Sequence, residues 1–135
     1  MTSRELAIEA ARAADDKKAS EIRVMDIGEK LGITDFFVIC SGNTERQVHR
    51  IQDVVEERLR GLGVKPARRE GERFRLWVLL DYADFVVHIF REEERQFYNI
   101  ERLWRDVEYV PWEPDPAVRE RADGESREEE KPLRQ

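Results

Sequence analysis

The residues best suited to chemistry are a short loop of small polar residues and three aspartates. Residues 41–44 (Ser-Gly-Asn-Thr) lead from an apolar run into a helical pattern, and backbone N–H groups at such a place can hold a phosphate. With magnesium on Asp35, Asp81 or Asp84, this loop would suit a nucleotidyltransferase. Two-metal catalysis, however, requires carboxylates that converge on ions about 4 Å apart, whereas Asp81 and Asp84 are three residues apart across a turn. We therefore favour a plain turn capped by Thr44 over a catalytic set of Ser41, Asp81 and Asp84.

The two histidines and the single cysteine lack the partners that a metal or nucleophilic site needs. His88 lies within an apolar run, in phase with Val86 and Phe90, which favours a packed, hydrogen-bonded histidine over an exposed contact residue. His49 falls on a helical segment with no cysteine or histidine in register, so we expect no metal and no cofactor. Cys40 lies inside a second apolar run, which predicts an inert buried thiol.

A basic segment and an aromatic cluster are the two candidates for binding another macromolecule. The segment 65–75 has a net charge of +3, which indicates either a solvated edge strand or a minor contact with RNA through Lys65, Arg68, Arg69 and Arg73. Large aromatic side chains beside charged ones are typical of protein-binding hot spots, because they bury much area at a small entropic cost. A candidate cluster of this kind lies within 28 positions next to the charged run 91–95 and comprises Trp77, Tyr82, Phe97, Tyr98 and Trp104.

Some of the aromatic residues must instead form the core. We expect Phe85, Phe90 and Phe97 to be buried, and Trp77 and Tyr98 to have an exposed role at an interface. We therefore expect these residues to form a protein-binding site and not a catalytic one.

Composition limits the remaining classes of protein. The chain has 135 residues, a net charge of −6, and 40% hydrophobic and 40% charged residues, which fits one domain with a charged surface. It has no apolar run long enough to span a membrane and no signal-peptide pattern at the N-terminus, and its one cysteine suits a reducing compartment. We expect a cytoplasmic protein that binds neither membranes nor DNA.

The elements that must position these residues follow from periodicity and caps. Residues 1–112 form the predicted domain, whereas residues 113–135 hold eight acids, five bases and three prolines and predict a disordered tail with a short helix near 116–122. The predicted order is α-β-β-α-β-β-β-α: helices at 6–14, 44–61 and within 92–107, and strands at 21–27, 35–40, 64–69, 76–80 and 85–90. A crossover from the second strand through the long helix to the third strand predicts a parallel pair. We expect an α/β (α+β) fold with a mixed, mostly five-stranded sheet flanked by helices.

Several segments of the chain together resemble the ribosomal silencing factor family, also called the Iojap family. The resemblance covers about residues 5–106 in the family's order and spacing, and leaves the tail outside. It rests on residues 14–19 (Ala-Asp-Asp-Lys-Lys-Ala), 33–43 (Ile-Thr-Asp-Phe-Phe-Val-Ile-Cys-Ser-Gly-Asn), 46–48 (Arg-Gln-Val), 77–84 (Trp-Val-Leu-Leu-Asp-Tyr-Ala-Asp) and 88–98 (His-Ile-Phe-Arg-Glu-Glu-Glu-Arg-Gln-Phe-Tyr).

The resemblance implies a fold like that of the nucleotidyltransferases without their catalytic set, and a homodimer when free. It also implies a non-enzymatic repressor that binds the large ribosomal subunit, mainly through its ribosomal protein fourteen, and blocks joining of the small subunit when nutrients are scarce. Arg91 departs from the family, which often has a second histidine there. By position, the partner surface would draw on Trp77, Tyr82, Asp84, His88, Glu92, Glu93, Arg95 and Tyr98.

Two alternatives remain open from the sequence. One is an assembly factor for the large subunit that binds at the same place, because silencing and assembly require the same contact. The other, less favoured, is the magnesium-dependent nucleotidyltransferase.

Overall fold

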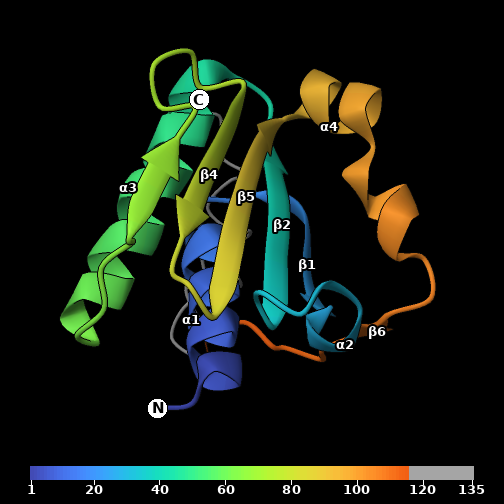
Figure 1. Cartoon of the computed structure of the whole chain (residues 1–135). Helices are drawn as coiled ribbons and strands as arrows, with labels where there is room; N and C mark the ends of the chain where they lie inside the picture. The colour runs from blue at the N-terminus through green and yellow to red at the C-terminus, as the bar shows by residue number, and fades with distance from the viewer. Residues whose placement is uncertain (116–135) are drawn as a thin grey trace.

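The protein is a single mixed sheet with two helices on one face and shorter helical segments on the other, as Figure 1 shows. The structure is a computed structural model that describes residues 1–115, so most of the predicted tail, including the short helix near 116–122, lies outside the described residues. In chain order the elements are α1 (Ser3–Asp16), β1 (Ser20–Asp26), α2 (Gly28–Leu31), β2 (Phe36–Gly42), α3 (Glu45–Gly61), β3 (Arg68–Glu70), β4 (Trp77–Asp81), β5 (Phe85–Arg91), α4 (Glu92–Tyr98), the 3₁₀ helix η1 (Ile100–Trp104) and β6 (Glu108–Tyr109).

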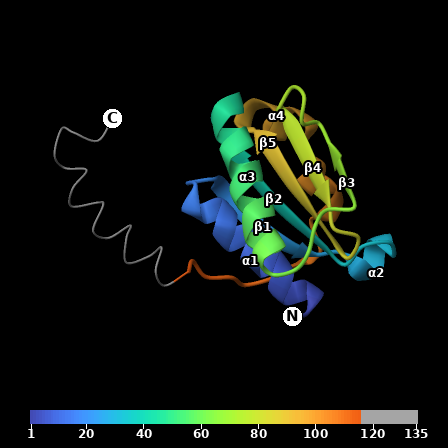
Figure 2. The ribbon, with the colours of Figure 1, turned by 90° about the vertical axis from the view of Figure 1, so that its left-hand side faces the viewer.

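The two long helices begin where the sequence predicts. The hydroxyl of Thr2 accepts a hydrogen bond from the backbone N–H of Glu5, and the Glu5 carboxylate accepts one from the N–H of Thr2, which is a complete capping box. Thr44 caps α3 by accepting a hydrogen bond from the backbone N–H of Gln47. Both helices cover the same face of the sheet (Figure 2), where α1 contributes five buried alanines and α3 an apolar stripe.

The sheet has the strand order β3-β4-β5-β2-β1-β6, and among the described strands only β2 and β5 run parallel. The α/β fold class is confirmed, but the predicted parallel partner of β2 is wrong, since it is β5 and not β3. The reason is burial: β5 is buried along most of its length and takes a central place, whereas the three residues of β3 are all exposed and charged and lie at the edge.

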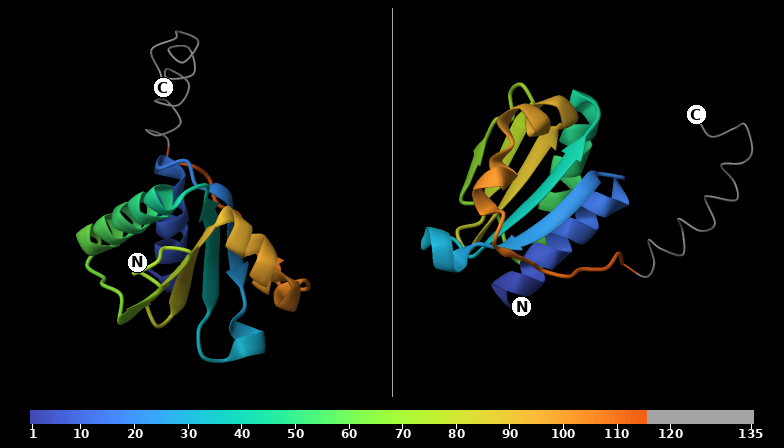
Figure 3. Two further views of the ribbon diagram at one scale, coloured as in Figure 1. Left: turned by 90° about the horizontal axis from the view of Figure 1, so that it is seen from above. Right: turned by 90° about the vertical axis from the view of Figure 1, so that its right-hand side faces the viewer.

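The second face of the sheet has a smaller core. Met25, Ile27, Ile39 and Phe90 are fully buried there under η1 and the segment that follows it. The left panel of Figure 3 shows α4 and η1 on this side of the sheet and α1 and α3 on the other. Neither α2 nor β6 was expected from the sequence. The strand β6 has only two residues and makes the sheet six-stranded rather than five-stranded.

The last described residues remain in contact with the domain. Trp112 donates from its indole to the carbonyl of Ile22, and the carbonyl of Glu113 accepts a hydrogen bond from Arg12 at 2.8 Å. Contacts with the domain therefore continue beyond the predicted boundary at residue 112. No helix in residues 1–115 combines the length and apolar character that crossing a membrane requires.

Candidate partner-binding site

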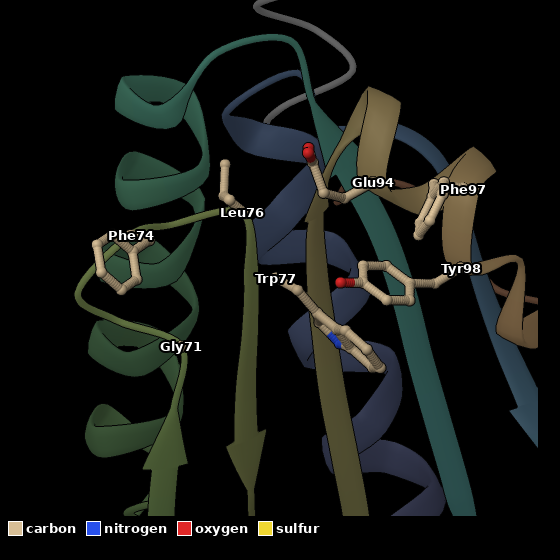
Figure 4. Close-up of a pocket in the computed structure, with 7 residues that line it drawn as sticks. All are labelled: Gly71, Phe74, Leu76, Trp77, Glu94, Phe97 and Tyr98. Atoms are coloured by element: carbon tan, nitrogen blue, oxygen red, sulfur yellow. The ribbon is translucent and has the colours of Figure 1, made fainter.

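The second face of the sheet is open between α4 and the loop that joins β3 to β4. A pocket of about 430 Å³ lies there (Figure 4), and we call it the aromatic pocket. Its lining comes from the β3–β4 loop, the start of β4 and one side of α4, and comprises Gly71, Phe74, Leu76, Trp77, Glu94, Phe97 and Tyr98.

Trp77 forms one wall of the pocket and is held there by two neighbours from β5. Its indole stacks on Phe90 with 4.7 Å between ring centroids, and its Nε1 donates a hydrogen bond to Nδ1 of His88 at 3.1 Å. His88 is buried, which confirms the predicted packed histidine. Burial lowers the pKa of His88 to about 4, so the ring is neutral at pH 7 and able to accept this bond. The orientation of Trp77 is thus fixed before any partner binds.

Tyr98 and Phe97 bring α4 into the pocket. The ring of Tyr98 lies beside Trp77, 5.1 Å between centroids, with 47% of the residue exposed. Phe97 is 80% exposed, so its predicted place in the core is wrong, whereas Phe85 and Phe90 are buried as predicted. A helix of seven residues at the end of a central strand can bury only one narrow side, and Phe97 lies off that side. Exposed aromatic rings around a preformed hollow are suited to binding an apolar group.

The first turn of α4 places acidic side chains beside the pocket. Arg91 forms two hydrogen bonds with Glu94, at 2.8 and 3.0 Å, and reaches Glu93 at 3.6 Å. The side chain of Glu93 is 80% exposed, and Glu92 is half-buried. Arg91 thus pairs with two carboxylates, whereas the carboxylate of Glu92 accepts a hydrogen bond from Oγ of Ser41 at 3.4 Å. The three glutamates outnumber Arg91, so the rim of the pocket on the α4 side is acidic and would suit a basic partner.

The eight residues expected at the partner surface do not form one patch. Trp77, Tyr98, Glu92 and Glu93 lie around the end of the sheet that carries α4. Tyr82 and Asp84 lie in the β4–β5 turn at the opposite end, where Oδ2 of Asp84 accepts a hydrogen bond from Ser3. The side chains of His88 and Arg95 are buried, which removes both from the exposed surface.

The basic residues expected to contact RNA are partly occupied within the chain. Arg69 forms a bidentate pair with Glu56 on α3, with its shortest contact at 2.6 Å, and Arg68 lies 3.3 Å from Asp81. Lys65 and Arg73 are exposed, and Arg73 lies over the ring of Phe74. The edge strand β3 thus uses charge chiefly to attach to its neighbours.

The aspartates considered for nucleotidyl transfer lie far from Ser41, although Asp35 and Asp84 are neighbours, since the N–H of Asp35 donates to the carbonyl of Asp84 at 2.8 Å. Ser41 pairs with Phe90 across the β2–β5 ladder, whereas Asp81 pairs with Val86, so the two lie about 13 Å apart along the strands. Gln47 closes the loop from within, since its Oε1 accepts a hydrogen bond from the N–H of Asn43 at 2.7 Å. Within residues 1–115 no group of three or more potential ligands could hold a metal ion. Cys40 is buried as predicted.

Four lining residues were not predicted as site residues from the sequence, namely Gly71, Phe74, Leu76 and Glu94. Gly71 has a φ of +83°, and a Cβ there would lie 1.9 Å from the carbonyl oxygen of Trp77. Glycine at this turn lets the loop fold back against β4. The sequence Glu70-Gly71-Glu72 indicates a turn at Gly71. The close approach of Gly71 to the Trp77 backbone could not be predicted, because it depends on how the loop folds against β4.

The fold and the site together fit a small binding domain whose most prominent feature is a preformed aromatic pocket with an acidic rim. Comparison with known proteins identifies its family. The model of the family described as "Ribosomal silencing factor during starvation" matches residues 1–135, which includes the tail that the sequence analysis left outside. The chain therefore belongs to the ribosomal silencing factor family.

Individual relatives agree with this assignment. A ribosomal silencing factor from Halalkalibacterium halodurans is 40% identical over 84% of this chain and 97% of its own length, and one from Bacillus subtilis is 39% identical over 73% and 83%. A crystal structure of a Chromobacterium violaceum protein is similar with a TM-score of 0.75 and 31% identity, over 77% of this chain and 87% of that one. These matches span most of the described domain.

Proposed function

We propose that this protein binds the large ribosomal subunit through ribosomal protein fourteen and sterically prevents the small subunit from joining. The observation that carries the proposal is the aromatic pocket, where Trp77 is already oriented and Tyr98 and Phe97 are exposed in a chain that belongs to the silencing factor family. A steric blocker requires affinity at the right place and no chemistry. The scattered Ser41 and Asp81 are consistent with that requirement.

Electrostatics favours a protein contact over an RNA contact. A net charge of −6 opposes association with the phosphates of ribosomal RNA, and Arg69 is already paired with Glu56. The acidic rim at Glu92 and Glu93 would instead attract a basic protein surface, with apolar anchors in the pocket supplying most of the affinity. A cytoplasmic location and the homodimer implied by the family resemblance both stay predictions.

Binding can be tested directly with purified components. The dissociation constant of the full chain would be measured by interferometry against large subunits, small subunits and isolated ribosomal protein fourteen. The proposal predicts binding to large subunits and to protein fourteen, and none to small subunits. Binding to large subunits alone would refute protein fourteen as the main contact, and binding to neither would overturn the proposal.

A further inference from the structure

The helix α4, which carries Phe97 and Tyr98 of the pocket, is attached to the domain through a buried arginine. Among the seven residues of α4, all within the described part of the chain, the single buried side chain is Arg95, which is 6% exposed. Phe97 and Tyr98 face outward instead. A helix this short has little intrinsic stability, so its position must come from tertiary contacts. Here the central contact is ionic.

Arg95 links α4 to three other elements at once. Its Nε and Nη2 donate to the two carboxylate oxygens of Glu101 on η1, at 3.0 and 3.2 Å. Its Nη1 donates to Oγ of Ser41 on β2 at 3.2 Å and to the carbonyl of Ser20 on β1 at 3.3 Å. Glu101 also accepts a hydrogen bond from Arg23 on β1 at 2.7 Å. We call Arg95, Glu101, Arg23 and Ser41 the arginine clamp.

The electrostatics of the clamp agree with its geometry. Burial raises the pKa of Glu101, but the hydrogen bonds from Arg95 and Arg23 outweigh it, so the pKa lies below its usual value and the carboxylate is charged at pH 7. A planar guanidinium that makes bidentate bonds fixes direction as well as distance. The clamp therefore determines how α4 is oriented over the sheet.

We infer that Arg95 is a positioning residue for partner binding, acting through the arginine clamp to hold Tyr98 beside Trp77. The inference rests on the proposed function and revises the role that the family resemblance implied, since a side chain this buried does not contact a partner directly. Only 5.1 Å separates the Trp77 and Tyr98 rings, so a small rotation of α4 would change the shape of the pocket. Affinity should depend on Arg95 although its side chain lies outside the pocket lining.

The variant Arg95→Met tests this inference without destroying the fold. Glu101 keeps its bond from Arg23, and Ser41 can still donate to the carbonyl of Ser20 at 3.3 Å, so neither group is left without a partner. Arg58→Met is the matched control. Arg58 also joins two elements through a carboxylate, lying 3.2 Å from Glu9, but it does so between α3 and α1 on the other face of the sheet.

We expect Arg95→Met to weaken binding to large subunits at least tenfold, and Arg58→Met to leave it within twofold of the wild type. Arg95→Lys keeps the charge but loses the bidentate geometry and should fall between Arg95→Met and the wild type. Amide hydrogen exchange of residues 92–98 in the free protein should be at least tenfold faster in Arg95→Met than in Arg58→Met. Equal affinities for Arg95→Met and Arg58→Met would overturn the inference.

Binding of the wild type to large subunits tests the proposed function, whereas the comparison of variants tests the positioning role of Arg95. If the wild type does not bind large subunits, the proposed function is wrong, and exchange in the free protein alone decides whether the arginine clamp holds α4. Faster exchange in Arg95→Met would then support the clamp, and unchanged exchange would refute it. If the wild type binds and Arg95→Met binds equally well, the proposed function stands and the positioning role falls.

Discussion

Replacing Tyr98 with alanine should weaken binding to the large subunit about 60-fold. Tyr98 is 47% exposed, and its ring forms one wall of the aromatic pocket beside Trp77. A tyrosine offers roughly 200 Å² of surface, so a partner that fills the pocket would bury about 100 Å² more of it. At about 25 cal/mol per Å² this burial contributes about 2.5 kcal/mol, which corresponds to the 60-fold change in dissociation constant.

Tyr109→Ala is the matched control for this experiment. Tyr109 is 49% exposed, almost the same fraction as Tyr98, but it lies on β6 at the opposite edge of the sheet from β3. Both variants would be titrated against labelled large subunits, and their thermal unfolding would be compared to confirm that each is folded. A dissociation constant for Tyr98→Ala within threefold of the wild type, or an equal loss in Tyr109→Ala, would refute the assignment of the pocket.

Three further predictions concern the groups that support the site. Gly71→Ala should lower the free energy of unfolding by at least about 2 kcal/mol in denaturant titrations, because Gly71 has a φ of +83° and an added Cβ would lie 1.9 Å from the Trp77 carbonyl oxygen. Gly61→Ala is the control and should not lower it, because the space around Gly61 is open. Equal effects of the two substitutions would contradict this prediction. Between pH 4 and 6.5 the unfolded chain binds more protons at His88 than the folded one, so this residue should raise the free energy of unfolding by about 3 kcal/mol as pH increases through that window. The slope should be smaller in His88→Phe, and an unchanged slope would count against a buried neutral ring. Burial raises the pKa of Cys40 to about 12, so a disulfide reagent should modify this thiol only after unfolding, and rapid modification of the folded protein would show the thiol to be accessible.

Much of the fold could be predicted because local signals and burial agreed. The caps at Thr2 and Thr44 mark the starts of the long helices, and the nearly continuous apolar run of β2 indicates a strand covered on both faces. The neighbour of β2 could not be read in this way, because the choice between β3 and β5 depends on which strand can be buried centrally. The two residues of β6 carry no periodicity to detect.

The site was predicted in part. Trp77 and Tyr98 do lie together, as large aromatic residues beside a charged run suggested. Arg95 looked like one more charge in that run, and nothing local indicates that it alone turns inward to meet Glu101 and Ser41. Phe97 was predicted to be buried because it is hydrophobic, but it is exposed. A hydrophobic side chain is buried only when it lies on the side of its helix that packs against the domain.

The proposed function requires that this protein keep the ribosomal subunits apart. The most direct test is sucrose-gradient sedimentation of purified large and small subunits, at a magnesium concentration that joins them, with and without the full chain. We expect fewer 70S particles and the protein travelling with the large subunit, with both effects reduced in Tyr98→Ala. An unchanged 70S peak with the protein left at the top of the gradient would contradict the proposed function.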